Sequence, residues 1–150
     1  MSTLWGLPDF DAHEEVHFVT DEKCGLKAII ALHSTHLGPA AGGARFWHYA
    51  NGEQALTDAL RLSRGMSYKN AMAGLPMGGA KAVILADPDR TKSPELFAAY
   101  GRAVQGLGGA YVTAEDVGIS VDDLVAVAKE TRYVSGLPVA SGKAGGDPGP

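Results

Sequence analysis

The chain has 150 residues, of which 45% are hydrophobic and 20% are charged, and its formal net charge is -4. These values are typical of one ordinary globular domain and exclude a disordered or fibrous class. The acidic balance and the lack of a basic run argue against a general nucleic-acid binder, which needs clustered cations to displace counterions from phosphates.

Membrane and export signals are also missing from the sequence. The longest apolar stretch, around Leu26 to Leu32, is interrupted by Lys27 and is far shorter than the roughly 20 residues that cross a bilayer. The first 15 residues have neither the cationic start nor the apolar centre of a secretory signal. Cys24 is the only cysteine, so no internal disulfide can form. We therefore expect a cytoplasmic protein that binds neither membrane nor nucleic acid.

The first elements of the chain have the pattern of strands. Residues 15–20 (EVHFVT) alternate polar and apolar side chains, and residues 26–33 (LKAIIALH) form an apolar run rich in β-branched residues. Turn residues lie between them, so the pattern predicts an antiparallel hairpin. A bend rich in Gly and Pro follows, and residues 43–48 (GARFWH) can form another short strand.

Helical signals begin at Asn51, a favourable N-cap with Gln54 three residues later. Apolar side chains then recur at helical spacing, which predicts a helix over 52–72. The next segment, KAVILA at 81–86, is a continuous apolar run typical of a buried parallel strand.

Two more helices and one strand are predicted in the last third of the chain. Ser93 before a proline is an N-cap and first-turn pair, which predicts a helix over 94–106. Residues 110–114 (AYVTA) read as a strand, and Ser120 opens a helix that ends at about residue 130.

This alternation of helices and strands predicts an α/β fold. We expect a mixed, mostly parallel sheet that starts with an antiparallel hairpin and has helices on both faces, which makes a three-layer sandwich.

The end of the chain is rich in Gly and Pro. We therefore expect the chain to consist of one domain over 1–141 and a flexible linker tail over 142–150.

Three sequence motifs match known sites only in part. HEEVH at 13–17 has the letters of a zinc motif, but on a strand His13 and His17 lie roughly 13 Å apart at about 3.3 Å per residue, so we expect surface or strand-edge histidines and no metal site. GLPMGGAK at 74–81 lacks the Ser or Thr of a phosphate-binding loop and precedes a strand. GLGGAY at 106–111 follows a helix, so it is a helix end and not a dinucleotide fingerprint.

Two other histidines, His33 and His36, have no third metal ligand nearby in the sequence. We expect a solvated or core-edge role for both.

Three charged residues form a candidate site: Lys69 near the end of a predicted helix, Lys81 at the start of KAVILA, and Asp116 after the strand AYVTA. Ligands of parallel α/β sheets gather at the carboxyl ends of strands, which is where Asp116 lies. An apolar environment and a neighbouring cation both disfavour a charged lysine, so one lysine can act as a base while the other binds a carboxylate. A nearby carboxyl group can transfer protons. Spacing alone leaves open that the lysines stabilise a helix end or reach solvent and that the aspartate is a cap.

Longer blocks of the sequence carry a resemblance to a known family. The runs GPAAGGARFW, ALTDALRLSRGMSYKNAMAGLPMGGAKAVILADP, YVTAEDVGISVDDL and ETRYVSGLP occur in this order over nearly the whole chain. Together they resemble the amino-terminal domain of the leucine, phenylalanine and valine dehydrogenases, within the wider glutamate dehydrogenase family. The resemblance implies NAD-dependent oxidative deamination of a hydrophobic L-amino acid to the 2-keto acid and ammonia. It also implies a homo-oligomer.

The resemblance assigns a role to each of the three charged residues. Lys69 in GMSYKN matches the family lysine that binds the substrate carboxylate. Lys81 in GGAKAV matches the catalytic lysine that activates the water attacking the imine, and Asp116 in AEDVG matches its acidic partner in proton transfer.

Further positions are expected to contact the substrate. Gly42 and Gly43 match glycines whose lack of a side chain lets the substrate approach the backbone. The same pocket is expected to include Ala41, Met66 and Ala114.

The sequence departs from the family pattern at three places. Ala80 stands where the family has a third glycine before the catalytic lysine, so its methyl group can narrow the site or shift Lys81. Ala41 replaces a larger residue of the leucine enzymes, which leaves room for a phenylalanine-like side chain. The family's NAD-binding Rossmann domain is absent from these 150 residues, and hydride transfer needs donor and acceptor carbons about 3 to 3.5 Å apart. We therefore expect the chain alone to be inactive, and the alternative role is an isolated non-catalytic oligomerisation domain.

Overall fold

A mixed sheet forms the middle layer of the computed structural model, which describes residues 3–87 and 92–137. The order of its strands is β1-β2-β5-β3-β6, and β4 also pairs with β5. The strands are β1 (Glu15–Asp21), β2 (Leu26–Ser34), β3 (Ala40–Ala41), β4 (Ala44–Trp47), β5 (Gly78–Leu85) and β6 (Tyr111–Val112). The α-helices are α1 (Gly52–Met72), α2 (Pro94–Gly106) and α3 (Val121–Ala128), and a short 3-10 helix spans Leu4–Gly6. The predicted linker tail, 142–150, lies outside the described residues.

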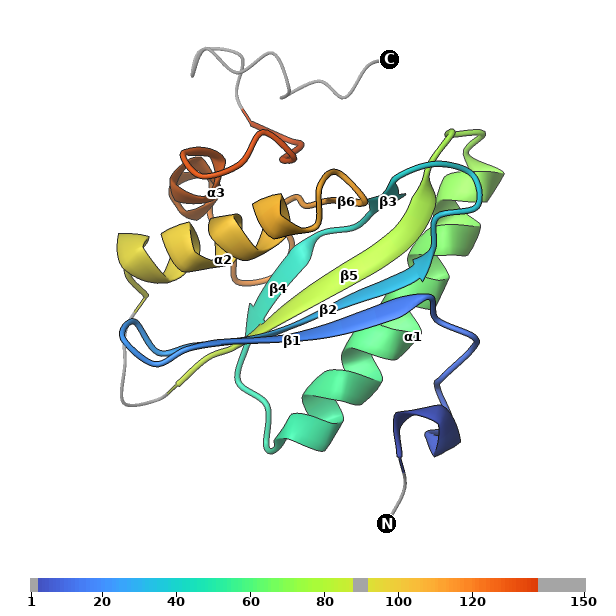
Figure 1. Ribbon diagram of the computed structural model, residues 1–150, viewed down its shortest axis with the longest axis horizontal. Coiled ribbons are helices and arrows are strands. Elements are labelled where there is room, and N and C mark those ends of the chain that lie inside the picture. The colour runs from blue at the N-terminus through green and yellow to red at the C-terminus, as the bar shows by residue number, and fades with distance from the viewer. Residues whose placement is uncertain (1–2, 88–91, 138–150) are drawn as a thin grey trace.

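The helices lie on both faces of the sheet, so the predicted three-layer α/β sandwich is confirmed (Figure 1). Helix α1 crosses one face along β2 and β5, and α2 and α3 cover the other. β1 and β2 form the predicted antiparallel hairpin, and β5 pairs in parallel with β3 and β4.

The helix starts follow from local capping. The Asn51 side chain accepts a hydrogen bond from the Gln54 N–H at 2.9 Å, and Ser93 caps α2 in the same way. At α3, Ser120 and Asp123 bond reciprocally to each other's backbone N–H, which is a complete capping box. These side chains supply partners for helix N–H groups that have none within the helix, so the sequence marks all three starts.

The predicted strands differ from the structure in four ways. β5 begins at Gly78, so Lys81 is its fourth residue and does not open it. The strand is also antiparallel to β2 on one side, with Gly79 at its start beside Ser34 at the end of β2, whereas its apolar run was predicted to be typical of a buried parallel strand. The predicted bend contains β3, and the strand expected over 110–114 is only Tyr111–Val112.

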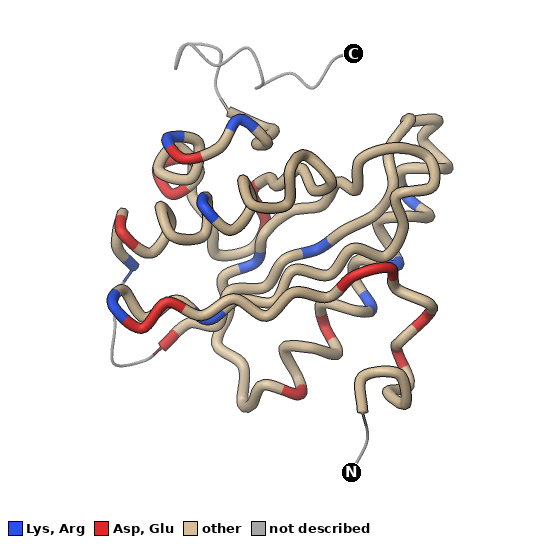
Figure 2. The backbone as a smooth tube through the Cα atoms, in the orientation of Figure 1, with Lys and Arg blue, Asp and Glu red and all other residues tan. Residues whose placement is uncertain are grey.

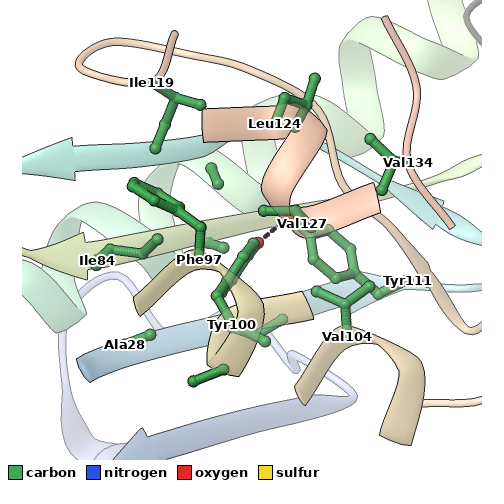
Figure 3. Close-up of a cluster of buried hydrophobic side chains, with 14 of the residues drawn as sticks. Ala28, Ile84, Phe97, Tyr100, Val104, Tyr111, Ile119, Leu124, Val127 and Val134 are labelled. Atoms are coloured by element: carbon green, nitrogen blue, oxygen red, sulfur yellow. Dashed lines mark hydrogen bonds between the residues drawn. The ribbon is translucent and has the colours of Figure 1, made fainter. Parts of the chain in front are cut away.

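Side-chain alternation along the central strands divides the core in two. Ile30, Ala82 and Ile84 belong to the cluster on the side of α2 and α3. Figure 3 shows Ile84 in this cluster together with the large side chains of Phe97 and Tyr100. The other face of the strands packs against α1 in a smaller cluster of Ile29, Ala31, Ala55, Ala59 and Val83. The small residues of α1 let this helix lie close to the sheet.

His13 is buried, with 6% exposure, so of the two predicted settings, the surface or a strand edge, the surface is wrong for this histidine. Its Nε2 lies 2.8 Å from the Leu60 carbonyl oxygen, and its Nδ1 accepts a hydrogen bond from the Asp11 N–H at 3.0 Å. This pattern requires a neutral ring with its proton on Nε2. Desolvation by burial lowers the pKa of His13 and outweighs its hydrogen bond to Leu60.

We expect the free energy of unfolding to fall as the pH drops below about 6.5, the ordinary histidine value, because the unfolded chain then protonates His13 while the folded chain does not. The slope from one proton is at most about 1.4 kcal/mol per pH unit. Urea denaturation between pH 5 and pH 8 (roughly the range over which histidines titrate) measures it. His13→Gln should flatten this dependence, whereas the matched variant of exposed His36, His36→Gln, should keep it. Equal slopes in all three proteins would contradict the assignment.

Neither a membrane span nor a metal cluster is found in the described part of the chain. No helix within residues 3–87 and 92–137 is long and apolar enough to cross a bilayer. Across the same residues, no group of three or more His, Cys, Asp or Glu side chains has the geometry to hold a metal ion.

Candidate active site

Lys81 and Asp116 form an ion pair near the surface of the sheet. The Lys81 ammonium nitrogen lies 2.6 Å from Asp116 Oδ2, and the two side chains are 10% and 23% exposed. Asp116 follows the short strand β6, and Lys81 stands in the middle of β5 on the face that α1 covers. Figure 2 shows that basic residues occupy β4 and β5 in the middle of the sheet. The structure therefore brings together two of the three charged residues of the predicted site.

The carboxylate of Asp116 is stabilised in its charged form. Burial raises its pKa, but the close Lys81 ammonium, the Val117 N–H and the charge of Arg45 outweigh burial and hold the pKa below its ordinary value. Arg45 projects from β4, and its Nε lies 3.6 Å from Asp116 Oδ2. Asp116 thus lies between two cations on neighbouring strands.

Lys69 lies in the last turn of α1, where it is exposed. The direction of the Lys69 side chain can be inferred from Asp58, which lies on the same helix. Asp58 pairs with Arg45 of β4 at 3.2 Å, so Asp58 lies on the flank of α1 that faces β4. Lys69 comes eleven residues later, which is about three turns of helix and about 16 Å along the axis, so it lies on the same flank. Below it, the Asn70 side chain donates to the Gly78 carbonyl oxygen at 2.8 Å. Lys69 therefore projects on the side of the sheet that carries Lys81.

Gly42 and Gly43 fill positions where a side chain would collide with the chain itself. A Cβ added at Gly42 would come within 1.6 Å of the Ala80 carbonyl oxygen, and one at Gly43 within 2.9 Å of the Asp116 Cβ. Both glycines are therefore required by the packing that places Lys81 and Asp116 together. Their contact with a substrate remains a prediction.

A buried hydroxyl group holds the backbone at Gly42. The Tyr111 hydroxyl lies 2.8 Å from the Gly42 carbonyl oxygen and 3.0 Å from the Thr113 hydroxyl, and the Tyr100 hydroxyl lies 2.9 Å from Thr113 (the Tyr100 and Tyr111 pair is drawn in Figure 3). Burial raises the pKa of Tyr111 to about 12, so it remains a hydrogen-bond donor at neutral pH. The buried Tyr111 side chain thereby holds the loop between β3 and β4 in place.

Comparison with known proteins identifies the family of this chain. Residues 13–133 match the family described as Glu/Leu/Phe/Val dehydrogenase, dimerisation domain. The chain belongs to this family. It is 56% identical to a leucine dehydrogenase of Bacillus subtilis over 133 residues, and 58% identical to a valine dehydrogenase of Streptomyces albus over 137 residues.

These matches cover 89% and 91% of this chain but only 36% and 38% of the two relatives, so the chain spans little more than a third of their length. Among solved structures, an L-tryptophan dehydrogenase from Nostoc punctiforme superimposes with a TM-score of 0.78 at 52% identity. That match covers 81% of this chain and 36% of the other. The fold of this family member is thus shared with amino-acid dehydrogenases.

The Ala80 departure from the family pattern has a clear structural setting. Ala80 is fully buried and belongs to the apolar cluster under α2 and α3. Because side chains alternate along β5, its methyl group points to the face opposite Lys81. The expectation that this methyl group narrows the site or shifts Lys81 is therefore not supported by the geometry.

The other predicted pocket residues of this family member lie on three different segments of the chain. Ala41 is half-buried at the end of β3, and the Ala114 carbonyl oxygen accepts a hydrogen bond from the Ala44 N–H at 2.8 Å. Met66 is half-buried on α1, three residues before Lys69. Two surface cavities lie elsewhere, one beside the end of β5 and one at the start of α1, and neither is lined by Lys81 or Asp116.

Arg45, Asp58 and Asn70 are site residues that sequence reasoning missed. Asn70 carries a signal, because it is a polar residue on the buried stripe of α1, seven residues after the buried Ser63. Arg45 and Asp58 carry none, since a charged residue on a short strand or on a helix flank usually faces solvent.

Residues 106–111, the segment that partly matches a dinucleotide motif, do not fit a dinucleotide. Residues 106–111, which contain the sequence GLGGAY, run from the end of α2 to the start of β6. A dinucleotide fingerprint instead joins a strand to the N-terminus of a helix, where the backbone N–H groups meet the pyrophosphate. The predicted reading of this motif as a helix end is confirmed.

Proposed function

We propose that this domain binds the substrate and supplies the proton-transfer groups of a dehydrogenase that oxidatively deaminates a hydrophobic L-amino acid to the 2-keto acid and ammonia. The ion pair between Lys81 and Asp116 is the observation that carries the proposal, because it lies within the segment that matches the family. The resemblance implies NAD as the hydride acceptor. The part that this domain itself plays in the proposed reaction is substrate binding and proton transfer.

Lys69 and Lys81 are assigned different roles because they differ in exposure to solvent. Lys69 is exposed and can meet the carboxylate of an incoming amino acid as a point charge. Lys81 is nearly buried, so a water molecule beside it is shielded from solvent. In its neutral form, Lys81 takes a proton from this water, whose oxygen then attacks the imine carbon. The 2.6 Å contact lets the proton pass on to Asp116, which later returns it to the leaving amine.

The substrate side chain is proposed to be apolar. The relatives are named for leucine and valine, and the solved relative for tryptophan. Ala41, Met66 and Ala114 would offer an apolar wall with two small side chains, which accommodates a larger group than the pocket of a leucine enzyme. Phenylalanine is therefore included among the candidate substrates.

The test uses a protein that carries this domain joined to the dinucleotide-binding region of a leucine or valine dehydrogenase. We expect NADH to form with hydrophobic L-amino acids in a panel that includes leucine, valine, phenylalanine, tryptophan and glutamate. NADH formation with glutamate alone would contradict the proposal. So would the absence of NADH formation with every amino acid of the panel.

Assembly is a second candidate function, because the matched family is described as a dimerisation domain. We propose that the chain forms a homo-oligomer, either as part of the enzyme or as its sole role. Light scattering of the 150-residue chain measures its mass against the monomer value of 15.6 kDa. A monomer at all concentrations tested would contradict an assembly role.

Lys69→Ala should weaken substrate binding more than it slows turnover. Loss of one charge-assisted contact of about 1.5–3 kcal/mol predicts a rise in KM of roughly 10- to 100-fold. Steady-state kinetics of the dehydrogenase described above measures both parameters, and Lys23→Ala in the exposed hairpin turn is the matched control. An unchanged KM would remove Lys69 from the carboxylate site.

A further inference from the structure

A second cation, Arg45, lies at the candidate site and has no part in the reaction proposed above. Its guanidinium lies between two carboxylates: Nη1 is 3.2 Å from Asp58 Oδ2, and Nε is 3.6 Å from Asp116 Oδ2. The first carboxylate belongs to α1, and the second belongs to the segment after β6. Arg45 therefore connects the helix layer to the residue that faces Lys81.

Asp58 is itself fixed by a further buried donor. The Tyr49 hydroxyl donates to Asp58 Oδ2 at 2.7 Å, whereas Arg61, whose Nη2 lies 2.9 Å from Oδ1, is exposed to solvent and adds little to the position of Asp58. The Asp58 side chain is only 14% exposed. Burial and the neighbouring carboxylate raise the pKa of Tyr49, so this donor keeps its proton at neutral pH. The α1 end of the connection is thus held in one place.

The end of the connection at Asp116 is not saturated with hydrogen bonds. Arg45 Nε and Asp116 Oδ2 are both buried, and neither has a well-directed hydrogen bond within residues 3–87 and 92–137. They lie opposite each other at 3.6 Å, and an approach of about 0.7 Å would bring them to an ordinary hydrogen-bond distance. Lys81 already compensates the charge of Asp116 Oδ2 at 2.6 Å, and the opposite charge of Arg45 at 3.6 Å attracts the same oxygen from the other side.

We propose that Arg45 is a positioning residue for Asp116: anchored on α1 through Asp58, it holds the carboxylate at the distance at which it meets Lys81. This inference rests on the proposed function, in which Asp116 and Lys81 exchange a proton. The guanidinium suits this role because its planar fork can face two carboxylates at once, which the point charge of a lysine cannot do. While Lys81 is neutral and before Asp116 takes up the proton, Arg45 still attracts the Asp116 carboxylate and keeps it in place.

Several polar groups surround Asp116 and enter any titration of it. Lys81 approaches from β5, Arg45 from β4, and the Tyr111 hydroxyl lies on β6, where the charge of Asp116 contributes to its raised pKa. The neighbouring Glu115 is exposed. The effect of Arg45 must therefore be separated from that of Lys81.

Nuclear magnetic resonance of the full 150-residue chain provides this separation without requiring turnover. The carboxyl carbon of Asp116 is titrated in the unaltered protein, in Arg45→Gln and in Arg61→Gln. Arg61 pairs with the same Asp58 but has no contact with Asp116, so it is a matched control. Arg45→Gln should raise the pKa of Asp116 and Arg61→Gln should leave it in place. Equal values in the two variants would overturn the inference.

A readout in the unaltered fold covers the case in which Arg45→Gln does not fold. As the pH changes, the Arg45 Nε–H resonance should shift with the same midpoint as the Asp116 carboxyl carbon. The same shift should be seen in Asp58→Asn, which has no titrating carboxyl group at position 58. An Arg45 resonance that is insensitive to Asp116 in both proteins would overturn the inference.

Kinetics of the dehydrogenase then separates this inference from the proposed function. Arg45→Gln should lower kcat on the order of 100-fold with little change in KM, as expected for a misplaced catalytic group, and Arg61→Gln should change neither. Arg45→Lys should recover part of kcat, since it restores the positive charge without the planar fork of the guanidinium.

Two outcomes separate the positioning role of Arg45 from the proposed function. If Lys81→Ala is inactive while Arg45→Gln behaves like Arg61→Gln, the positioning role of Arg45 is wrong and the proposed function stands. If Lys81→Ala is fully active, the proposed function is wrong. The nuclear magnetic resonance titrations then still show whether Arg45 acts on Asp116.

Discussion

Lys81→Ala is expected to lower turnover by about 10²- to 10⁴-fold, the usual contribution of a positioned general acid or base. The variant removes the nitrogen that lies 2.6 Å from Asp116 and leaves that carboxylate facing Arg45 alone. Substrate binding should survive in part, because Lys69 lies on a different element and meets the substrate carboxylate. Steady-state and single-turnover kinetics of the dehydrogenase, together with equilibrium binding of the amino acid, measure the two effects separately.

The matched control is Lys129→Ala, which removes an exposed lysine at the end of α3. It should leave kcat and KM unchanged. The pKa of Asp116 in Lys81→Ala is a second measurement: it should rise, because the Lys81 ammonium is the largest of the influences that lower it. Turnover in Lys81→Ala equal to that of the unaltered enzyme would exclude Lys81 from the mechanism.

Gly42→Ala is expected to destabilise the fold by at least about 3 kcal/mol, the upper end of the usual cost of overpacking. The added methyl group would lie 1.6 Å from the Ala80 carbonyl oxygen, so β3 and β5 could not keep their present separation. No flexible side chain is available to yield, because the opposing atom belongs to the backbone. Urea denaturation monitored by circular dichroism measures the loss.

Gly65→Ala makes the same chemical change where there is space. Gly65 lies within α1, and an added Cβ would meet nothing within 4 Å. Alanine is favoured over glycine in a helix by about 1 kcal/mol, so this variant should be slightly more stable than the unaltered chain. Equal stability of Gly42→Ala and Gly65→Ala would show that the loop at Gly42 can move aside. The packing argument for the site would then fail.

Much of the fold was predictable because its signals are local. The caps at Asn51, Ser93 and Ser120 act within one turn of helix, so the starts of α1, α2 and α3 could be read directly. The alternating and apolar runs of the first two strands similarly marked the hairpin. The strands at the edge of the site were harder, because β3 and β6 are two residues long and are defined by their neighbours in the sheet.

The candidate site was predictable only in part. Lys69, Lys81 and Asp116 were identified from motifs and from the family resemblance, but their surroundings were not. His13 was expected at the surface or at a strand edge, and its burial against α1 depends on residues about 50 positions away. Arg45 gave no signal of its role, since both its carboxylate partners are distant in sequence.

The sequence by itself determined the α/β class, the helix starts and the family, because capping, periodicity and motif spacing are properties of neighbouring residues. Only the tertiary structure decided that Ala80 faces the core, that Gly42 and Gly43 are needed for packing, and that Arg45 lies between Asp58 and Asp116. The physical reason is that these features depend on strand register and on which face of the sheet each helix covers. Contacts between distant segments settle both, and the charges around Asp116 then follow from them.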